Sequence, residues 1–159
     1  MASDIFIQNK RARFQYEFIE KLVAGIELCG TEIKSIRAGH ASLVDAYCRF
    51  IPNFKKPDKP ELYLLMNITE YSHGGYSNHD PKRERKLLLK RRELDKLSKK
   101  VKTAGLTIVP IKLFITEKGF IKIEIALSRG KKVSDKREDI KDRDSKRDLD
   151  RVRKDNHRS

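Results

Sequence analysis

The chain has 159 residues, of which 37 are lysine or arginine and 23 are aspartate or glutamate, so its formal net charge is +14 at pH 7. This length suffices for one domain with a hydrophobic core and an extension, and the positive charge favours a nucleic acid or an anionic surface over a small neutral ligand. No apolar run approaches the roughly 20 residues that a membrane-spanning helix needs, and the N-terminus lacks the pattern of a signal peptide. We therefore expect neither a membrane-spanning helix nor a signal peptide.

Residues 14–29 alternate in part between apolar and polar side chains, a pattern typical of strands. We expect two strand segments there, separated by a bend or bulge at Gly25. The side chain of Thr31 is then predicted to cap a short helix over residues 32–37, and Gly39 to end it. The first part of the chain therefore predicts strands that flank one short helix.

Two further strands are predicted to form a hairpin. Residues 43–51 form the first strand and residues 61–69 the second, and a loop rich in proline and lysine joins them over residues 52–60. The second strand has apolar residues at odd and even positions alike, so we expect protein to cover both of its faces.

The segment from Asp80 to Gly105 combines dense positive charge with an apolar stripe. Asp80 before Pro81 is the pattern of an N-cap followed by the first helical residue, and Gly105 is a typical stop. Apolar residues recur between them at helical spacing, namely Leu87, Leu94, Leu97 and Val101. We therefore predict a long helix whose cationic face suits a polyanion, with a merely solvated surface helix as the alternative.

Two last strands are predicted over residues 106–115 and 120–127, and Gly119 supplies the positive φ of the turn between them. About six short strands with one short and one long flanking helix predict a mainly β, α+β fold, an OB-like closed β-barrel. A β-sandwich is the alternative. We assign residues 1–128 to this RNA-binding barrel domain.

Residues 129–159 form a basic C-terminal tail with thirteen basic residues, eight acidic residues and no aromatic residue. The apolar residues of the tail are too sparse for a core, so we expect the tail to be disordered when free. Folding on an RNA partner is the functional hypothesis for this segment, and an inert solubilising tail is the alternative.

Residue types that serve catalysis or metal binding do not gather into a recognisable motif. The four histidines show no metal-ligand spacing with one another or with Cys29 and Cys48, and the chain has no glycine-rich phosphate loop or nucleophile elbow. Both cysteines are expected to be buried small hydrophobes in a reducing compartment. We therefore predict a protein that is not an enzyme and needs no cofactor or metal.

Five segments, taken in order, resemble the SsrA-binding protein family, also called small protein B. The segments are NKRARFQYEF, GIELCGTEIKSIRAGHASLVDAY, NHDPKRERKLLLKRRELDKL, GLTIVPIKLF and RGKKVSDKREDIKDRD, and together they cover most of the chain. The resemblance implies an OB-like barrel that binds transfer-messenger RNA (SsrA RNA) in the bacterial cytoplasm and delivers it to stalled ribosomes in trans-translation.

The resemblance also implies how the work is divided along the chain. The barrel would grip the tRNA-like domain of the RNA, and the tail would become helical in the decoding centre and the empty mRNA channel of the small ribosomal subunit. Elongation factor Tu and alanyl-tRNA synthetase act on the same RNA and are implied as partners through it. We expect the free protein to be a monomer.

Site residues follow from the same resemblance. Glu32 is implied as a hydrogen-bond acceptor for bases, with stabilisation of the first helical turn as the alternative. The other implied RNA contacts of the barrel are Asn9, Lys10, Arg11, Lys34, Arg37, His79, Arg83, Arg85 and Lys86. The tail residues implied to engage ribosomal RNA are Lys131, Lys132, Asp135, Lys136 and Arg137. Ser134 and Ser145 stand where family members often carry stacking residues, so the tail is expected to hold mainly by charge.

Three other functions are weighed against RNA delivery. A ribosomal or ribosome-assembly protein with an OB fold would share the charge and the fold but would bind ribosomal RNA alone. An RNA-modifying or nucleolytic enzyme would require a catalytic or metal cluster. A membrane-surface protein would require a large amphipathic apolar face.

Overall fold

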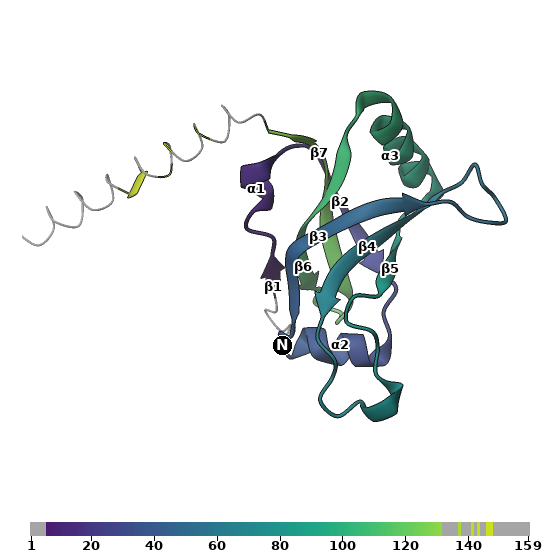
Figure 1. The fold of residues 1–159 in the computed structure, drawn as a ribbon, viewed down its shortest axis with the longest axis vertical. Coiled ribbons are helices and arrows are strands. Elements are labelled where there is room, and N and C mark those ends of the chain that lie inside the picture. Colours follow the sequence, from purple (N-terminus) through teal and green to yellow (C-terminus); the bar gives the residue numbers. More distant parts are fainter. Residues whose placement is uncertain (1–5, 132–136, 138–140, 142, 144–145, 148–159) are drawn as a thin grey trace, which may run out of the picture.

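The computed structural model describes residues 6–131 and, further along the chain, residues 137, 141, 143, 146 and 147. Residues 6–131 form strands and helices around one hydrophobic core (Figure 1). The strands are β1 (Phe6–Gln8), β2 (Tyr16–Ile26), β3 (Ala41–Ile51), β4 (Glu61–Ile68), β5 (Glu84–Leu88), β6 (Thr107–Ile115) and β7 (Ile121–Gly130). The helices are α1 (Ala12–Gln15), α2 (Gly30–Arg37) and α3 (Arg91–Ala104), and a 3₁₀ turn covers Gly75–Ser77.

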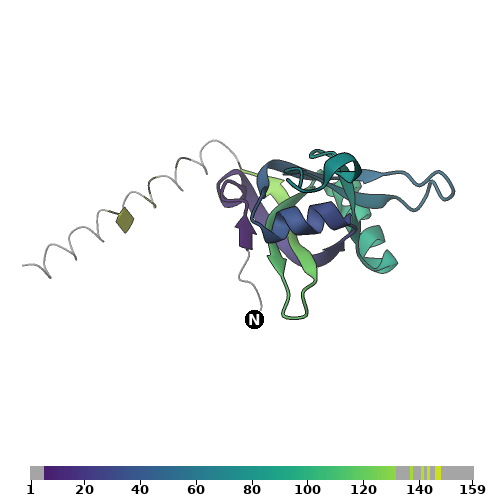
Figure 2. The same cartoon turned by 90° about the horizontal axis from the view of Figure 1, so that it is seen from below.

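The strands lie in the order β1-β6-β7-β2-β5-β4-β3, and each neighbouring pair is antiparallel. The strand at one end of this order, β3, packs against β6 and β1 from the other end. The sheet therefore curls into a nearly closed barrel, seen from two sides (Figure 1; Figure 2), and closure protects the edges of a sheet. The predicted α+β OB-like barrel is confirmed, with β1 and β5 as strands that the sequence pattern did not predict.

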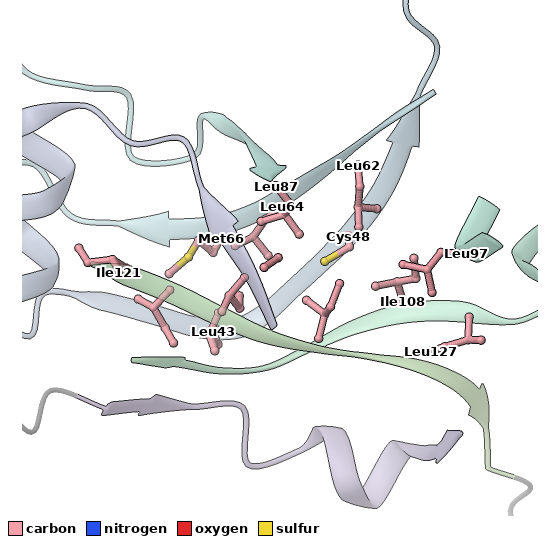
Figure 3. Packing of buried hydrophobic residues seen from close by; sticks show 14 of the residues in the cluster. Leu43, Cys48, Leu62, Leu64, Met66, Leu87, Leu97, Ile108, Ile121 and Leu127 are labelled. Atoms are coloured by element: carbon pink, nitrogen blue, oxygen red, sulfur yellow. The ribbon is translucent and has the colours of Figure 1, made fainter. Parts of the chain in front are cut away.

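The core is built from alternate residues of the strands. On β4 the buried residues are Leu62, Leu64, Met66 and Ile68. They belong to one cluster with Ile123 and Ile125 of β7 and with Leu94 and Leu97 of α3 (Figure 3). Burial of each large aliphatic side chain contributes about 1.5–3 kcal/mol, so this cluster is the main source of stability. The other face of β4 is only half-buried, so protein covers it less completely than predicted.

β2 is a single strand where two segments were predicted, and Phe14 lies before it in α1. Gly25 pairs with Leu88 of β5 on one side and with Lys122 of β7 on the other. A Cβ atom added to Gly25 would lie 3.3 Å from the Cβ of Leu88. The glycine therefore marks a close approach of two strands rather than a bend.

The long helix predicted from Pro81 is wrong in its first part. Residues 84–88 form β5, which lies between β4 and β2 in the barrel. Helix α3 begins after Lys90, whose backbone N–H donates to the Glu93 carboxylate over 3.2 Å. The helix ends at Gly105, which has φ +63 as its predicted role as a stop requires.

Asp80 forms a turn instead of capping a helix. Its carboxylate accepts a hydrogen bond of 2.9 Å from the backbone N–H of Lys82, and its carbonyl accepts one of 3.1 Å from Arg83. In β5 both Arg85 and Leu87 are fully buried, which is the period of a strand. Pairing with two neighbouring strands thus outweighs the local helical pattern.

The cations of α3 do not form one free cationic face. Arg91 lies 3.3 Å from the Glu61 carboxylate of β4, and Lys96 and Lys100 lie 3.7 and 3.2 Å from the Glu20 carboxylate of β2. Surface ion pairs of this kind contribute about 0–1 kcal/mol each, and together they orient α3 against the barrel. The helix still exposes Arg92, Lys99 and Lys102.

The last strand runs slightly past the predicted domain boundary at residue 128. Gly130 pairs with Tyr16 of β2, and the backbone N–H of Lys131 donates to the carbonyl of Gln15 over 2.9 Å. Beyond it, the backbone is helical at residues 137, 141, 143, 146 and 147. The rest of the tail, on which the prediction of disorder depends, lies outside the described residues.

Candidate nucleic-acid interface

Helix α2 begins with a buried carboxylate in its first turn. The backbone N–H of Cys29 donates to Oε1 of Glu32 over 2.8 Å, and α2 starts at Gly30. Thr31 is therefore not the N-cap that was predicted, and its hydroxyl lies 2.9 Å from Nδ1 of His79 instead. Gly39, with φ +79, follows the end of the helix as predicted.

Glu32 meets two arginines that lie more than fifty positions away in the sequence. Its Oε1 accepts a hydrogen bond of 2.5 Å from Nη2 of Arg83, and its Oε2 accepts one from Nε of Arg85. Nη1 of Arg85 also donates to the Met66 carbonyl over 2.6 Å, and Nη2 to the Pro81 carbonyl over 3.2 Å. This buried ion cluster of Glu32, Arg83 and Arg85 joins α2, β4, β5 and the turn before β5.

The charges of the buried ion cluster depend on one another. Burial by itself raises the pKa of Glu32, but hydrogen bonds from Arg83, the Cys29 backbone and Arg85 outweigh burial and lower that pKa to about 2. Burial lowers the pKa of Arg85 below its ordinary value, whereas the hydrogen bond to Glu32 raises the pKa of Arg83. Both Glu32 and Arg85 are fully buried, so removing the charge of Glu32 leaves Arg85 buried without its hydrogen-bonded counter-charge.

Acid should therefore weaken the fold through Glu32. The pKa of this carboxyl is lowered from 4.5 to about 2, so its contribution is complete above about pH 4.5 and is lost as the pH falls toward 2. The loss corresponds to about 3 kcal/mol of unfolding free energy. Urea unfolding at pH 6, 4.5, 3 and 2 measures it. The stability gap between wild type and Glu32→Gln should shrink across this range, and a constant gap would contradict the assignment.

His79 is also an internal residue, with 7% exposure. Its Nε2 lies 2.9 Å from the carbonyl of Ile68, and a carbonyl can only accept, so Nε2 carries the proton. In the neutral imidazole with its proton on Nε2, Nδ1 accepts from the Thr31 hydroxyl. Beside it, the amide of Asn78 closes the 71–78 loop through hydrogen bonds of 3.0 and 2.7 Å to the backbone of Tyr71.

Three of the implied RNA contacts are thus internal. The side chains of Glu32, Arg85 and His79 are enclosed by protein and hydrogen-bonded to it, and the direct RNA contact implied for them stays a prediction. The physical reason for their burial is that each satisfies buried polar groups of neighbouring segments. Through these contacts they position α2 and the segment from 71 to 83.

Of the implied RNA contacts, Lys34, Arg37 and Arg83 remain accessible around α2, and we call these three the α2 surface. Helix α2 lies at one end of the barrel (Figure 1). Lys34 places its ammonium 5.3 Å from the centre of the Tyr71 ring, and Arg37 reaches the carbonyl of Gly119 at 3.5 Å. Arg83 exposes 36% of its side chain while it holds Glu32. Such fixed cations suit the phosphates of a folded RNA.

Other implied contacts lie elsewhere on the barrel. Lys86 lies 3.9 Å from Glu61, away from the α2 surface. Asn9 and Lys10 line a groove of about 640 Å³ between β1, β2, β6 and β7, where the Asn9 amide donates to the carbonyl of Pro110 over 2.9 Å. Arg11 lines a separate pocket of about 240 Å³ beside the bulge of β3.

The groove holds cations that the sequence did not single out. Besides Lys10, its lining includes Arg13, Lys21 and Lys112, and Lys112 lies 3.6 Å from Glu124 of β7. Because strand pairing brings these residues together, only the alternation along β2 and β6 could have placed them on one face in advance.

Comparison with known proteins places this arrangement in a family. The family model described as "SmpB protein" matches residues 6–155. The chain belongs to the SmpB family. The "SsrA-binding protein" of Christiangramia forsetii is 50% identical over 155 residues, which is 97% of this chain and 94% of that protein. The protein of the same name from Phocaeicola vulgatus is 54% identical over 149 residues, or 93% and 95% of the two chains.

A solved structure shares the fold. A chain from the structure named "tmRNA-SmpB: a journey to the center of the bacterial ribosome" is 44% identical, with a TM-score of 0.63, and the match covers 81% of this chain and 86% of that one. The resemblance to the SsrA-binding protein family is thereby confirmed. The two SmpB relatives named above take their name from binding SsrA, and the name states no reaction.

Other predictions for this SmpB chain concern its cysteines, metals and membranes. Cys48 is buried, which raises the pKa of its thiol, but Cys29 is exposed, so the prediction of two buried cysteines is wrong for Cys29. Among the described residues, no group of three or more histidines, cysteines or acids could hold a metal ion. None of the helices in the described part is long and apolar enough to cross a membrane.

Two of the five tail residues implied by the family lie among the described residues. Lys131 and Arg137 are described, and the side chain of Arg137 is exposed. Lys132, Asp135 and Lys136 lie outside the described residues.

Proposed function

We propose that this chain binds transfer-messenger RNA and delivers it to stalled ribosomes in trans-translation. The observation that carries the proposal is the match to a chain from the tmRNA-SmpB structure on the bacterial ribosome, at 44% identity over 81% of this chain. Relatives named for SsrA binding, about 50% identical over nearly the whole chain, support it. The protein acts by binding and carries out no catalysis.

In this proposal the barrel holds the tRNA-like domain of the RNA. Lys34, Arg37 and Arg83 neutralise phosphates on the α2 surface, and Asn9 and Lys10 add contacts from the groove. Recognition rests on the shape of the folded RNA more than on its sequence. The buried ion cluster serves this recognition because it fixes α2 before RNA arrives, which reduces the ordering cost of binding.

The tail supplies the ribosomal half of the proposal. Its basic residues engage ribosomal RNA in the decoding centre and the mRNA channel of the small subunit, with Lys131, Lys132, Asp135, Lys136 and Arg137 as the contacts. The protein works as a monomer, and elongation factor Tu and alanyl-tRNA synthetase are partners through the shared RNA.

Recovery of RNA tests this proposal against the alternative of a ribosomal or assembly protein. The tagged protein is purified at high salt, and the RNA bound to it is sequenced. We expect enrichment of one RNA that ends in CCA and carries an internal reading frame. Enrichment of ribosomal RNA alone would overturn the proposal and favour the alternative.

Two matched variants assign the α2 surface in the same experiment. Lys34→Gln/Arg37→Gln should lower recovery and reduce the slope of log affinity against log salt by about 0.7–0.9 per lost phosphate contact. Lys99→Gln/Lys102→Gln removes the same charge from the exposed face of α3. If both pairs reduce recovery equally, net charge and not the α2 surface is responsible.

A further inference from the structure

The loop between β3 and β4 (residues 52–60) carries an aromatic side chain in an unusual position. Phe54 is 101% exposed, as if it were in an unfolded chain. A phenylalanine can bury roughly 150–250 Å² of surface. Because Phe54 is fully exposed, the protein gains no stability from the burial of this side chain. Figure 1 and Figure 2 both show this loop reaching out beyond α3. An apolar ring held at such a tip is suited to a partner rather than to the core.

The loop is ordered by its own hydrogen bonds. Oδ1 of Asn53 accepts from the backbone N–H of Lys55 over 3.0 Å, and the carbonyl of Asn53 accepts from Lys56 over 3.1 Å. The backbone N–H of Lys59 donates to the carbonyl of Lys56 over 2.9 Å. Three prolines at 52, 57 and 60 restrict the backbone further. Phe54 is therefore displayed by a built turn.

The base of the loop is fixed to the barrel. Nη2 of Arg91, the first residue of α3, donates to the carbonyl of Pro60 over 2.7 Å, and Nη1 lies 3.3 Å from the Glu61 carboxylate. Pro60 itself is buried. The tip thus has a set direction relative to the barrel, which reduces the entropy lost when a partner binds it.

The charge of the loop indicates the class of partner. Lys55 and Lys56 flank the ring and are exposed, and Lys59 is half-buried, whereas Asp58 is the single acid of the loop. An aromatic face with cations beside it is the arrangement with which proteins hold unpaired nucleotides, the ring stacking on a base and the lysines neutralising phosphates. RNA therefore fits this tip better than an apolar protein surface.

We propose that Phe54, Lys55 and Lys56 form a second contact with transfer-messenger RNA, in which the ring stacks on an unpaired base and the lysines hold the adjacent phosphates. The inference rests on the proposed function and extends it to a site outside the α2 surface. The delivered RNA is the source to which we commit, because the loop lies on the opposite side of the barrel from the end of β7, which leads into the ribosome-engaging tail (Figure 1).

The chain contains no tryptophan, which permits a direct test. Phe54→Trp places the only tryptophan at the tip, and its fluorescence is followed while transfer-messenger RNA is added. Total binding is measured in parallel by filter retention. We expect strong quenching with the same midpoint as total binding. Quenching by ribosomes that lack this RNA, with none by the RNA itself, would overturn the assignment to transfer-messenger RNA.

Affinity measurements separate the ring from the charges. Phe54→Ala should weaken binding by about 5- to 100-fold, the range that loss of one base–aromatic stack produces, while Phe54→Tyr should stay within about twofold because it keeps the ring. Lys55→Gln/Lys56→Gln should lower the salt slope by about 1.5. The thermal unfolding midpoint should not change in any of these variants, since the side chains are exposed.

The outcomes distinguish this inference from the function on which it rests. If wild type binds the RNA while Phe54→Ala binds equally and the tryptophan is not quenched, the second contact is wrong and the proposed function stands. If wild-type protein binds no transfer-messenger RNA, both fail together.

Discussion

Glu32→Gln should lower the free energy of unfolding by about 3–5 kcal/mol at neutral pH, the cost of leaving a buried partner charge unpaired. Arg85 is fully buried and donates its Nε–H to this carboxylate, and glutamine offers it an acceptor oxygen without the charge. Urea unfolding measured at pH 7 gives the difference directly.

Glu17→Gln is the matched control for this change. Glu17 is exposed on β2, so the same chemical substitution should alter stability by no more than about 0.5 kcal/mol. If Glu32→Gln costs less than about 1 kcal/mol, the buried ion cluster does not hold α2 and β5 together.

Removal of residues 132–159 should abolish tagging of stalled products. The affinity for transfer-messenger RNA should stay within about twofold of wild type, because the proposal assigns RNA binding to the barrel. The shortened chain keeps the last described contact of the barrel, between the Lys131 N–H and the Gln15 carbonyl. Filter binding measures the affinity, and a reconstituted translation reaction on a truncated message measures the tagging.

The thermal unfolding midpoint of the shortened chain distinguishes the possible reasons for failure. An unchanged midpoint together with lost RNA binding would show that the division between barrel and tail is wrong. Tagging at the wild-type level would show instead that the tail is dispensable on the ribosome.

Strand alternation predicted most of the barrel, but it failed at β5. The sequence offers Asp80–Pro81 as a helix start and apolar residues at helical spacing from Leu87 onward, and both signals are local. What decides β5 is pairing with β4 and β2, whose residues are distant in the sequence. β5 has only five residues, and one of its buried residues is an arginine. Its sequence therefore lacks the alternation of apolar and polar residues that would have predicted a strand instead of a helix.

The burial of Glu32, Arg85 and His79 was not predicted, for a related reason. A glutamate or histidine in a basic protein has the same appearance in the sequence whether it meets RNA or an internal partner. Glu32 contacts Arg85, which lies 53 positions away in the sequence, and His79 contacts Thr31, which lies 48 positions away. A local sequence pattern therefore could not predict that these side chains are buried. Lys34 and Arg37, on the exposed side of a short helix, followed correctly from the pattern as surface residues.

The buried ion cluster has a consequence for genetic screens of this protein. A screen that selects for loss of RNA binding would recover changes at Arg85 as readily as changes at Arg37, although only Arg37 is accessible to a ligand. Abundance in the cell separates the two classes, because a variant that loses an internal charge pair is degraded more than one that loses a surface contact. An RNA-binding site mapped from loss-of-function positions alone would therefore include buried residues that stabilise the barrel.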